Sequence, residues 1–101
     1  MAYNFDHFIK TVASAGTAEA LKSSEFRVES AVIMAEGDNT GNIYIGGSGI
    51  DSTGHYLAAG EIFTLPPTKD GKEDHDLNKI YIDADTNGEG VVVTYKSDTL
   101  K

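Results

Sequence analysis

The chain has 101 residues and a formal net charge of −8, and it contains no cysteine. This length predicts one domain with a thin core, and the acidic balance argues against a nucleic-acid partner because it repels phosphates. The lack of cysteine excludes disulfides, zinc–thiolate sites and a thiol nucleophile.

Residues 1–25 are interpreted as an N-terminal arm or a first strand. Four apolar side chains have the i, i+3, i+4, i+7 spacing of a helix, namely Phe5, Phe8, Ile9 and Val12. Because Ser14-Ala15-Gly16 follows so soon, we favour an extended arm or a strand over residues 8–13. The segment lacks the basic start and apolar run of a signal peptide, and no stretch of about 20 apolar residues suggests a membrane span. We therefore expect a protein made in the cytoplasm without a signal peptide.

Residues 26–97 have the pattern of a β-core. One long strand is predicted over residues 26–35, half exposed at first and then buried on both sides, with a bulge between the two parts. Shorter strands are predicted at residues 42–46, 56–58, 61–65, 79–83 and 91–95, separated by turns rich in Gly, Asn and Asp. Residues 66–76 are predicted to form a solvated loop, and residues 98–101 a polar tail.

This spacing predicts about six to eight short strands in one all-β domain. The fold class is a β-sandwich or a jelly-roll-like barrel, with the first 25 residues as an arm or first strand.

Four segments carry a family resemblance. They read NTGNIYIGGSGI at residues 39–50, YLAAGE at 56–61, LNKIYID at 77–83 and GEGVVV at 88–93. In this order they resemble a recurrent module of small virion proteins of tailed bacteriophages, and the resemblance spans roughly residues 28–95. It implies a structural role: a head decoration protein that oligomerises and stabilises the capsid, or a fibre or tail accessory protein. The module carries no catalytic residues, and the charged segment Thr68–Asp76 departs from it, which leaves the subclass open.

The segment from Asp83 to Gly88 has the spacing of the first half of a calcium loop, with oxygens at alternate positions. Its weak candidate ligands are Asp83, Asp85 and Asn87. The position of the closing bidentate glutamate is Thr94, and no helix follows, so this is not an EF-hand. The favoured interpretation is a hairpin turn on Asn87-Gly88, which supplies the positive φ angles of such turns. No cofactor is predicted.

Two further groups of polar residues could support chemistry. His75 lies in the charged stretch Glu73–Asp76, which offers metal-binding side chains, and His55 lies near Asp51 and Ser52. A charged loop is usually solvated, and no motif here positions a nucleophile beside an oxyanion hole. We therefore expect no enzymatic activity, and a small metal-dependent jelly-roll enzyme is the third hypothesis.

Four aromatic residues are candidates for an interface, namely Tyr44, Tyr81, Phe5 and Phe8. Tyr44 and Tyr81 alternate with isoleucines, which predicts that both are partly exposed. The first hypothesis, which the resemblance implies, is a phage virion decoration protein that binds itself, as a homo-oligomer, and the major capsid protein. The second is a fibre or tail module that binds a glycan or a receptor through exposed tyrosines.

Overall fold

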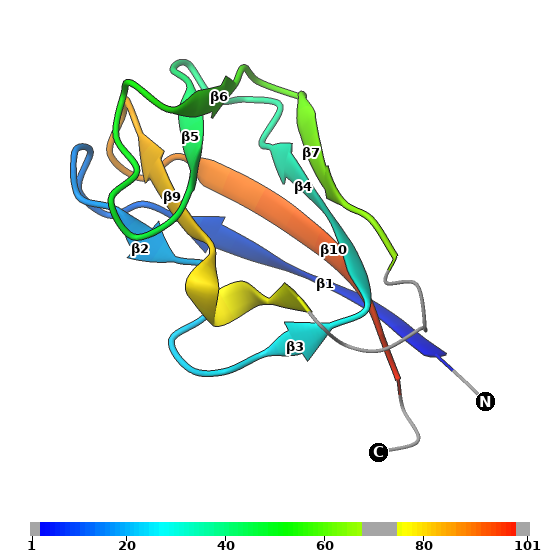
Figure 1. The fold of residues 1–101 in the computed structure, drawn as a ribbon. Helices are drawn as coiled ribbons and strands as arrows, with labels where there is room; N and C mark the ends of the chain where they lie inside the picture. Colours follow the sequence, from blue (N-terminus) through cyan, green and yellow to red (C-terminus); the bar gives the residue numbers. More distant parts are fainter. Residues whose placement is uncertain (1–2, 68–74, 99–101) are drawn as a thin grey trace.

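The computed structural model describes residues 3–67 and 75–98. Two four-stranded antiparallel sheets face each other, and a two-stranded sheet closes one end (Figure 1). The long sheet has the order β1 (Tyr3–Thr11), β10 (Gly90–Asp98), β4 (Ser30–Ala35) and β7 (Ile62–Leu65). The short sheet has the order β2 (Glu19–Ala20), β9 (Tyr81–Ala84), β5 (Ile43–Gly46) and β6 (His55–Leu57). The small sheet pairs β3 (Arg27–Val28) with β8 (His75–Asp76), and a 3₁₀ turn over Leu77–Lys79 leads into β9. The predicted all-β, sandwich-like fold is confirmed.

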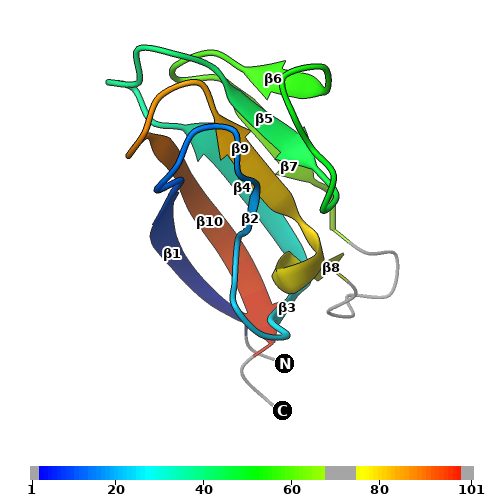
Figure 2. The same ribbon diagram turned by 90° about the vertical axis from the view of Figure 1, so that its left-hand side faces the viewer.

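The core lies between the long and short sheets, whose stacking is seen in Figure 2. Side chains alternate along β4, so that Ala31, Ile33 and Ala35 are buried as a strand with one face on the core requires. The fully buried side chains come from both sheets and the segments between them: Val12, Val28, Ile33, Ile43, Leu77, Ile82, Val91 and Val93. No helix in the described part of the chain is long and apolar enough to cross a bilayer.

The N-terminal segment is a strand of the long sheet. β1 pairs with β10 from Tyr3 to Thr11, so the first-strand alternative holds and the arm does not. The strand also begins and ends earlier than the predicted residues 8–13. The helical spacing is misleading here, because Phe8 points into the sandwich while Phe5 and Ile9 are exposed, as alternation along a strand requires.

The single strand predicted over residues 26–35 is wrong, because the chain changes sheets at Glu29. β3 pairs with β8, whereas β4 pairs with β10 and β7. The backbone N–H of Glu29 donates to Lys96 O (2.9 Å), and its carboxylate, 4% exposed, lies 3.1 Å from the Lys96 ammonium. A buried charge needs such a partner, so this pair fixes the point of crossing.

The predicted hairpin at Asn87-Gly88 is also wrong. Only Gly88 has a positive φ (+82°), and Glu89 N donates to Thr86 O (3.3 Å), so a tight turn does form. The strands on either side of it, β9 and β10, lie in different sheets. The turn is therefore a corner between the sheets. Immediately after it, Gly90 lies so close to β1 that a Cβ would overlap the carbonyl oxygen of Lys10.

Candidate functional site

The solvent-facing side of the long sheet is the candidate site, and we call it the outer face. The strand register sets three rows of side chains across it. The first row is Ile9, Val92, Met34 and Ile62; the second is His7, Thr94, Val32 and Thr64; the third is Phe5, Lys96 and Ser30.

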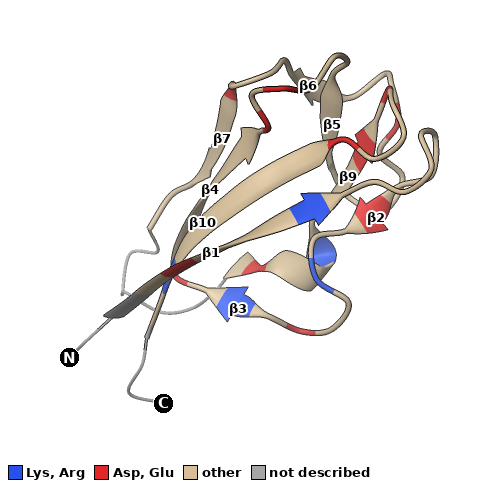
Figure 3. Ribbon diagram, turned by 180° about the vertical axis from the view of Figure 1, so that it is seen from behind, with Lys and Arg blue, Asp and Glu red and all other residues tan. Residues whose placement is uncertain are grey.

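The outer face is apolar and almost uncharged. Of the five large hydrophobic side chains that are exposed among the described residues, four lie here: Phe5 (73%), Ile9 (59%), Ile62 (56%) and Val32 (37%). None of the side chains in these three rows is a carboxylate, and the one cation among them, Lys96, pairs with Glu29. Figure 3 shows how little charge the strands of the long sheet carry. In a protein of net charge −8, the apolar and nearly neutral character of this face makes it the candidate interaction surface.

A shallow apolar depression of about 230 Å³ lies on this face. Phe5, Val32, Thr64, Pro67 and Lys96 contribute to its walls. The depression lies among side chains of the second and third rows. It is a place on the outer face where a partner's apolar side chain could insert.

The four predicted interface residues are not brought together. Tyr44 is buried (7% exposed), so its predicted exposure is wrong, and its hydroxyl donates to Asp85 Oδ1 (2.8 Å). This hydrogen bond to a carboxylate raises the pKa of Tyr44. Tyr81 is half-buried on the short sheet, and Phe8 points inward against Phe26 and Tyr95. Only Phe5 lies on the outer face.

The sequence pattern does not predict most of the outer face. The continuous apolar run from Ala31 to Ala35 predicts burial on both sides, yet Val32 and Met34 point outward between buried neighbours. The sequence feature that could have revealed Val32 and Met34 is that apolar residues also occupy the alternate positions of this strand, which face solvent when one side of a sheet is buried. Ile62 and Ile9 belong to the same row on the two edge strands, and only the register connects them.

The three residues predicted as weak calcium ligands instead accept hydrogen bonds from the backbone of neighbouring loops. Asp83 Oδ1 accepts from Gly16 N (2.9 Å), Asn87 Oδ1 from Ala15 N (2.7 Å), and Asp85 Oδ2 from Asn42 N (3.0 Å). Within residues 3–67 and 75–98 there is no group of three His, Cys, Asp or Glu that could hold a metal ion. The alternating oxygens thus connect the corner to its neighbouring segments.

The histidines and their acidic neighbours have other partners as well. Asp51 Oδ1 accepts from the backbone N–H (2.9 Å) and the hydroxyl (2.5 Å) of Thr53, which lowers the Asp51 pKa. The ring of His55 packs edge-on against Phe63 at 5.5 Å. His75 donates to Pro66 O (2.8 Å), while Glu73 and Asp74, predicted to lie beside it, fall outside the described residues.

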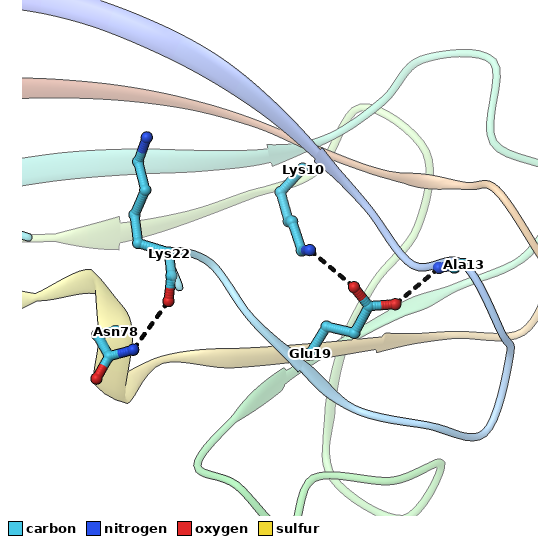
Figure 4. Close-up of polar contacts among 5 residues, drawn as sticks. All are labelled: Lys10, Ala13, Glu19, Lys22 and Asn78. Atoms are coloured by element: carbon cyan, nitrogen blue, oxygen red, sulfur yellow. Dashed lines mark hydrogen bonds and ion pairs between the residues drawn. The ribbon is translucent and has the colours of Figure 1, made fainter. Parts of the chain in front are cut away.

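The end of β1 is tied to the short sheet by Glu19, as Figure 4 shows. Glu19 Oε1 lies 2.7 Å from the Lys10 ammonium, and Oε2 accepts from Ala13 N (2.8 Å). The hydrogen bond from Lys10 is the largest cause of the lowered Glu19 pKa. The charge of Lys10, the cation of β1, is thereby neutralised by a half-buried carboxylate of the short sheet. Beside it, Asn78 donates to Lys22 O (2.9 Å) and fixes the 3₁₀ turn.

No protein family, no curated protein and no solved structure matches this chain in the comparisons made.

Proposed function

We propose that this chain is a bacteriophage virion structural protein of the head decoration kind, which acts by binding protein surfaces and has no catalytic role. Two independent lines support the proposal. The first is the resemblance of residues 39–50, 56–61, 77–83 and 88–93 to small phage virion proteins. The second, which carries the proposal, is the apolar outer face spanning all four strands of the long sheet.

The chemistry of the partner follows from the distribution of charge. The outer face offers apolar contacts and one cation, while the protein as a whole carries a net charge of −8. The complementary partner surface is therefore apolar at its centre and basic or neutral at its rim. A capsid assembled from many identical subunits can present such a surface repeatedly, which suits a small protein that binds as multiple copies.

The glycan-binding alternative gains no support from the tyrosines. Tyr44 is buried on the short sheet, Tyr95 contacts Phe8 and Phe26 inside the sandwich, and Tyr56 is exposed on β6. Tyr44 and Tyr56 are register partners, but of these three rings only that of Tyr56 is largely exposed, so they do not form the group of stacking rings that a glycan site needs.

The test is co-sedimentation with capsids assembled from the major capsid protein of the genome that encodes this chain. Val32→Glu places a carboxylate at the centre of the outer face and should abolish binding, because burying an unpaired charge is strongly unfavourable. Tyr56→Glu, on the opposite sheet and of equal net charge, should bind like the wild type. The proposal fails if the wild-type protein does not bind, or if the two variants lose binding equally.

A further inference from the structure

The four edges of the two main sheets are very unequal. Three end on short strands: β2 has two residues, β6 three and β7 four. β7 is also followed directly by Pro66-Pro67. Short strands and prolines are the usual means of blocking edge-to-edge pairing. The fourth edge, β1, is nine residues long, contains neither proline nor glycine, and pairs only with β10 within the described part of the chain.

The backbone groups of β1 that do not bond to β10 belong to its odd-numbered residues. In β10, the carbonyl of Lys96 accepts from Glu29 N, on the β4 side. Since backbone groups alternate sides along a strand, the odd-numbered residues of β10 face β1, where they meet even-numbered residues. The odd-numbered residues of β1, with His7 at the centre, therefore direct their N–H and C=O groups to the free edge. The N–H of His7 donates there to the exposed Asp6 carboxylate (2.8 Å), a local bond that a partner strand would replace.

We propose that β1 pairs with β1 of a second copy, antiparallel and across a two-fold axis at His7. This register uses the whole strand, because His7 is the midpoint of Tyr3–Thr11. It sets His7 opposite the partner's His7 and Phe5 opposite the partner's Ile9, so that two exposed apolar side chains pack against each other in each half of the interface. In this register every odd-numbered residue lies opposite an odd-numbered residue of the partner. Both strands therefore direct their backbone groups to the shared edge, where they can hydrogen-bond.

Charge favours a second copy as the occupant of this edge. Two molecules of net charge −8 repel each other, and they approach most readily where each is neutral. β1 has one carboxylate, Asp6, which accepts from the backbone N–H of His7, and one cation, Lys10, which is paired with Glu19. On the outer-face side of the strand, the exposed side chains among residues 5–11 are Phe5, His7, Ile9 and Thr11, none of them a carboxylate.

The pairing deepens the proposed function, and its biological meaning rests on that function. A two-fold axis through an antiparallel strand pair stands perpendicular to the sheet, so both outer faces lie on the same side. Two four-stranded sheets would become one continuous sheet with doubled apolar surface. Such a dimer binds a repetitive lattice by two contacts at once and gains avidity.

The first test compares two matched variants of the isolated protein by analytical ultracentrifugation over about 5–500 µM, the range in which a small interface associates. Ile9→Lys and Ile62→Lys change the same residue type at nearly equal exposure (59% and 56%) and lie at opposite ends of one row. We expect Ile9→Lys to raise the dimer dissociation constant by roughly tenfold or more, and Ile62→Lys to leave it unchanged. A wild-type monomer throughout the range, or a dimer that Ile62→Lys disrupts equally, overturns the inference.

The second test fixes the register and does not depend on how Ile9→Lys folds. The chain has no cysteine, so His7→Cys introduces one thiol. Directly opposed residues have Cα atoms about 5.5 Å apart, within the range of a disulfide, so oxidation should yield a covalent dimer. Phe5→Cys is the control, since its two copies would be more than about 13 Å apart along the strands. Equal cross-linking of both variants, or of neither, contradicts the register.

Failure of this inference and failure of the proposed function give different results. A monomeric protein that still binds capsids removes the β1 pairing alone. A β1-paired dimer that binds no capsid removes the proposed function alone.

Discussion

At the scale of single residues, one carboxylate holds together the corner at which the chain passes between the sheets. Glu89 Oε2 accepts from the backbone N–H (2.7 Å) and the hydroxyl (3.0 Å) of Thr40, and Oε1 accepts from Gly41 N (3.0 Å). These bonds, the one from Thr40 N foremost, lower the pKa of Glu89 from its ordinary 4.5. The charged form of Glu89 is therefore favoured by the folded state.

Glu89 should make the stability depend on pH in the acid range. Its pKa is lowered by folding, so the folded state binds fewer protons, and the stabilisation is complete above pH 4.5 and lost as the pH falls through the lowered value. We expect Glu89→Gln to unfold at a lower urea concentration than the wild type at pH 7, and the two midpoints to converge as the pH falls below the lowered pKa of Glu89.

The matched control for this experiment is Asp38→Asn, which removes a charge from an exposed position in the loop between β4 and β5 that contains Thr40 and Gly41. It separates the local hydrogen bonds from the general effect of net charge. If its pH profile departs from the wild type as much as that of Glu89→Gln, the pH dependence reflects net charge, and the role assigned to Glu89 is wrong.

At the scale of elements, one face of β1 packs in the interior of the sandwich and the other faces solvent. Phe8 contacts the rings of Phe26 (6.4 Å) and Tyr95 (6.1 Å), and the Lys22 ammonium lies 4.1 Å from the centre of its ring. Phe5, three residues earlier, is 73% exposed on the outer face. The inner face thus contributes to the stability of the monomer, and the outer face does not.

Replacing each phenylalanine by alanine should separate these roles. Phe8→Ala removes a ring from the aromatic cluster, and we expect it to lower the free energy of unfolding by about 2–4 kcal/mol. Phe5→Ala should change it by no more than about 0.5 kcal/mol, when measured by urea denaturation at low protein concentration. Comparable losses in the two variants would show that β1 does not present these two faces.

The sequence predicted elements well where alternation was local, and failed where partners were distant. The strands around residues 43–46, 62–65 and 81–84 were expected within about two residues, because isoleucines alternate with other side chains there. The break at Glu29 was missed, because only the distant Lys96 explains a buried carboxylate in a β-run. The outer face was missed for the same reason, since its rows join residues that only the register makes neighbours.

At the scale of the whole molecule, charge and apolar surface are segregated. The net charge is −8, yet the three described rows of the outer face carry no carboxylate and one cation, which is paired with Glu29. Because of this arrangement, two copies repel each other in most orientations, and the repulsion is weakest where their outer faces approach. Association through β1 would therefore work against the repulsion of the remaining surface.

Salt should strengthen the association of two copies. Raising the sodium chloride concentration from about 20 mM to about 0.5 M shortens the screening length to a few ångströms, which weakens the repulsion and leaves the apolar contacts intact. We expect the dimer dissociation constant, measured by ultracentrifugation, to fall severalfold. An interface built on ion pairs would respond in the opposite direction, so weaker association at high salt would contradict a neutral β1 interface.

A charge variant distant from β1 distinguishes screening from a general effect of salt on apolar contacts. Ser48→Lys combined with Ser52→Lys, in the exposed loop between β5 and β6 of the short sheet, adds two positive charges and changes the net charge from −8 to −6. Because the repulsion is reduced, this variant should dimerise more tightly than the wild type at low salt. The difference should vanish at high salt, where both surfaces are screened. If the two proteins instead respond in parallel at every salt concentration, net charge does not control the association.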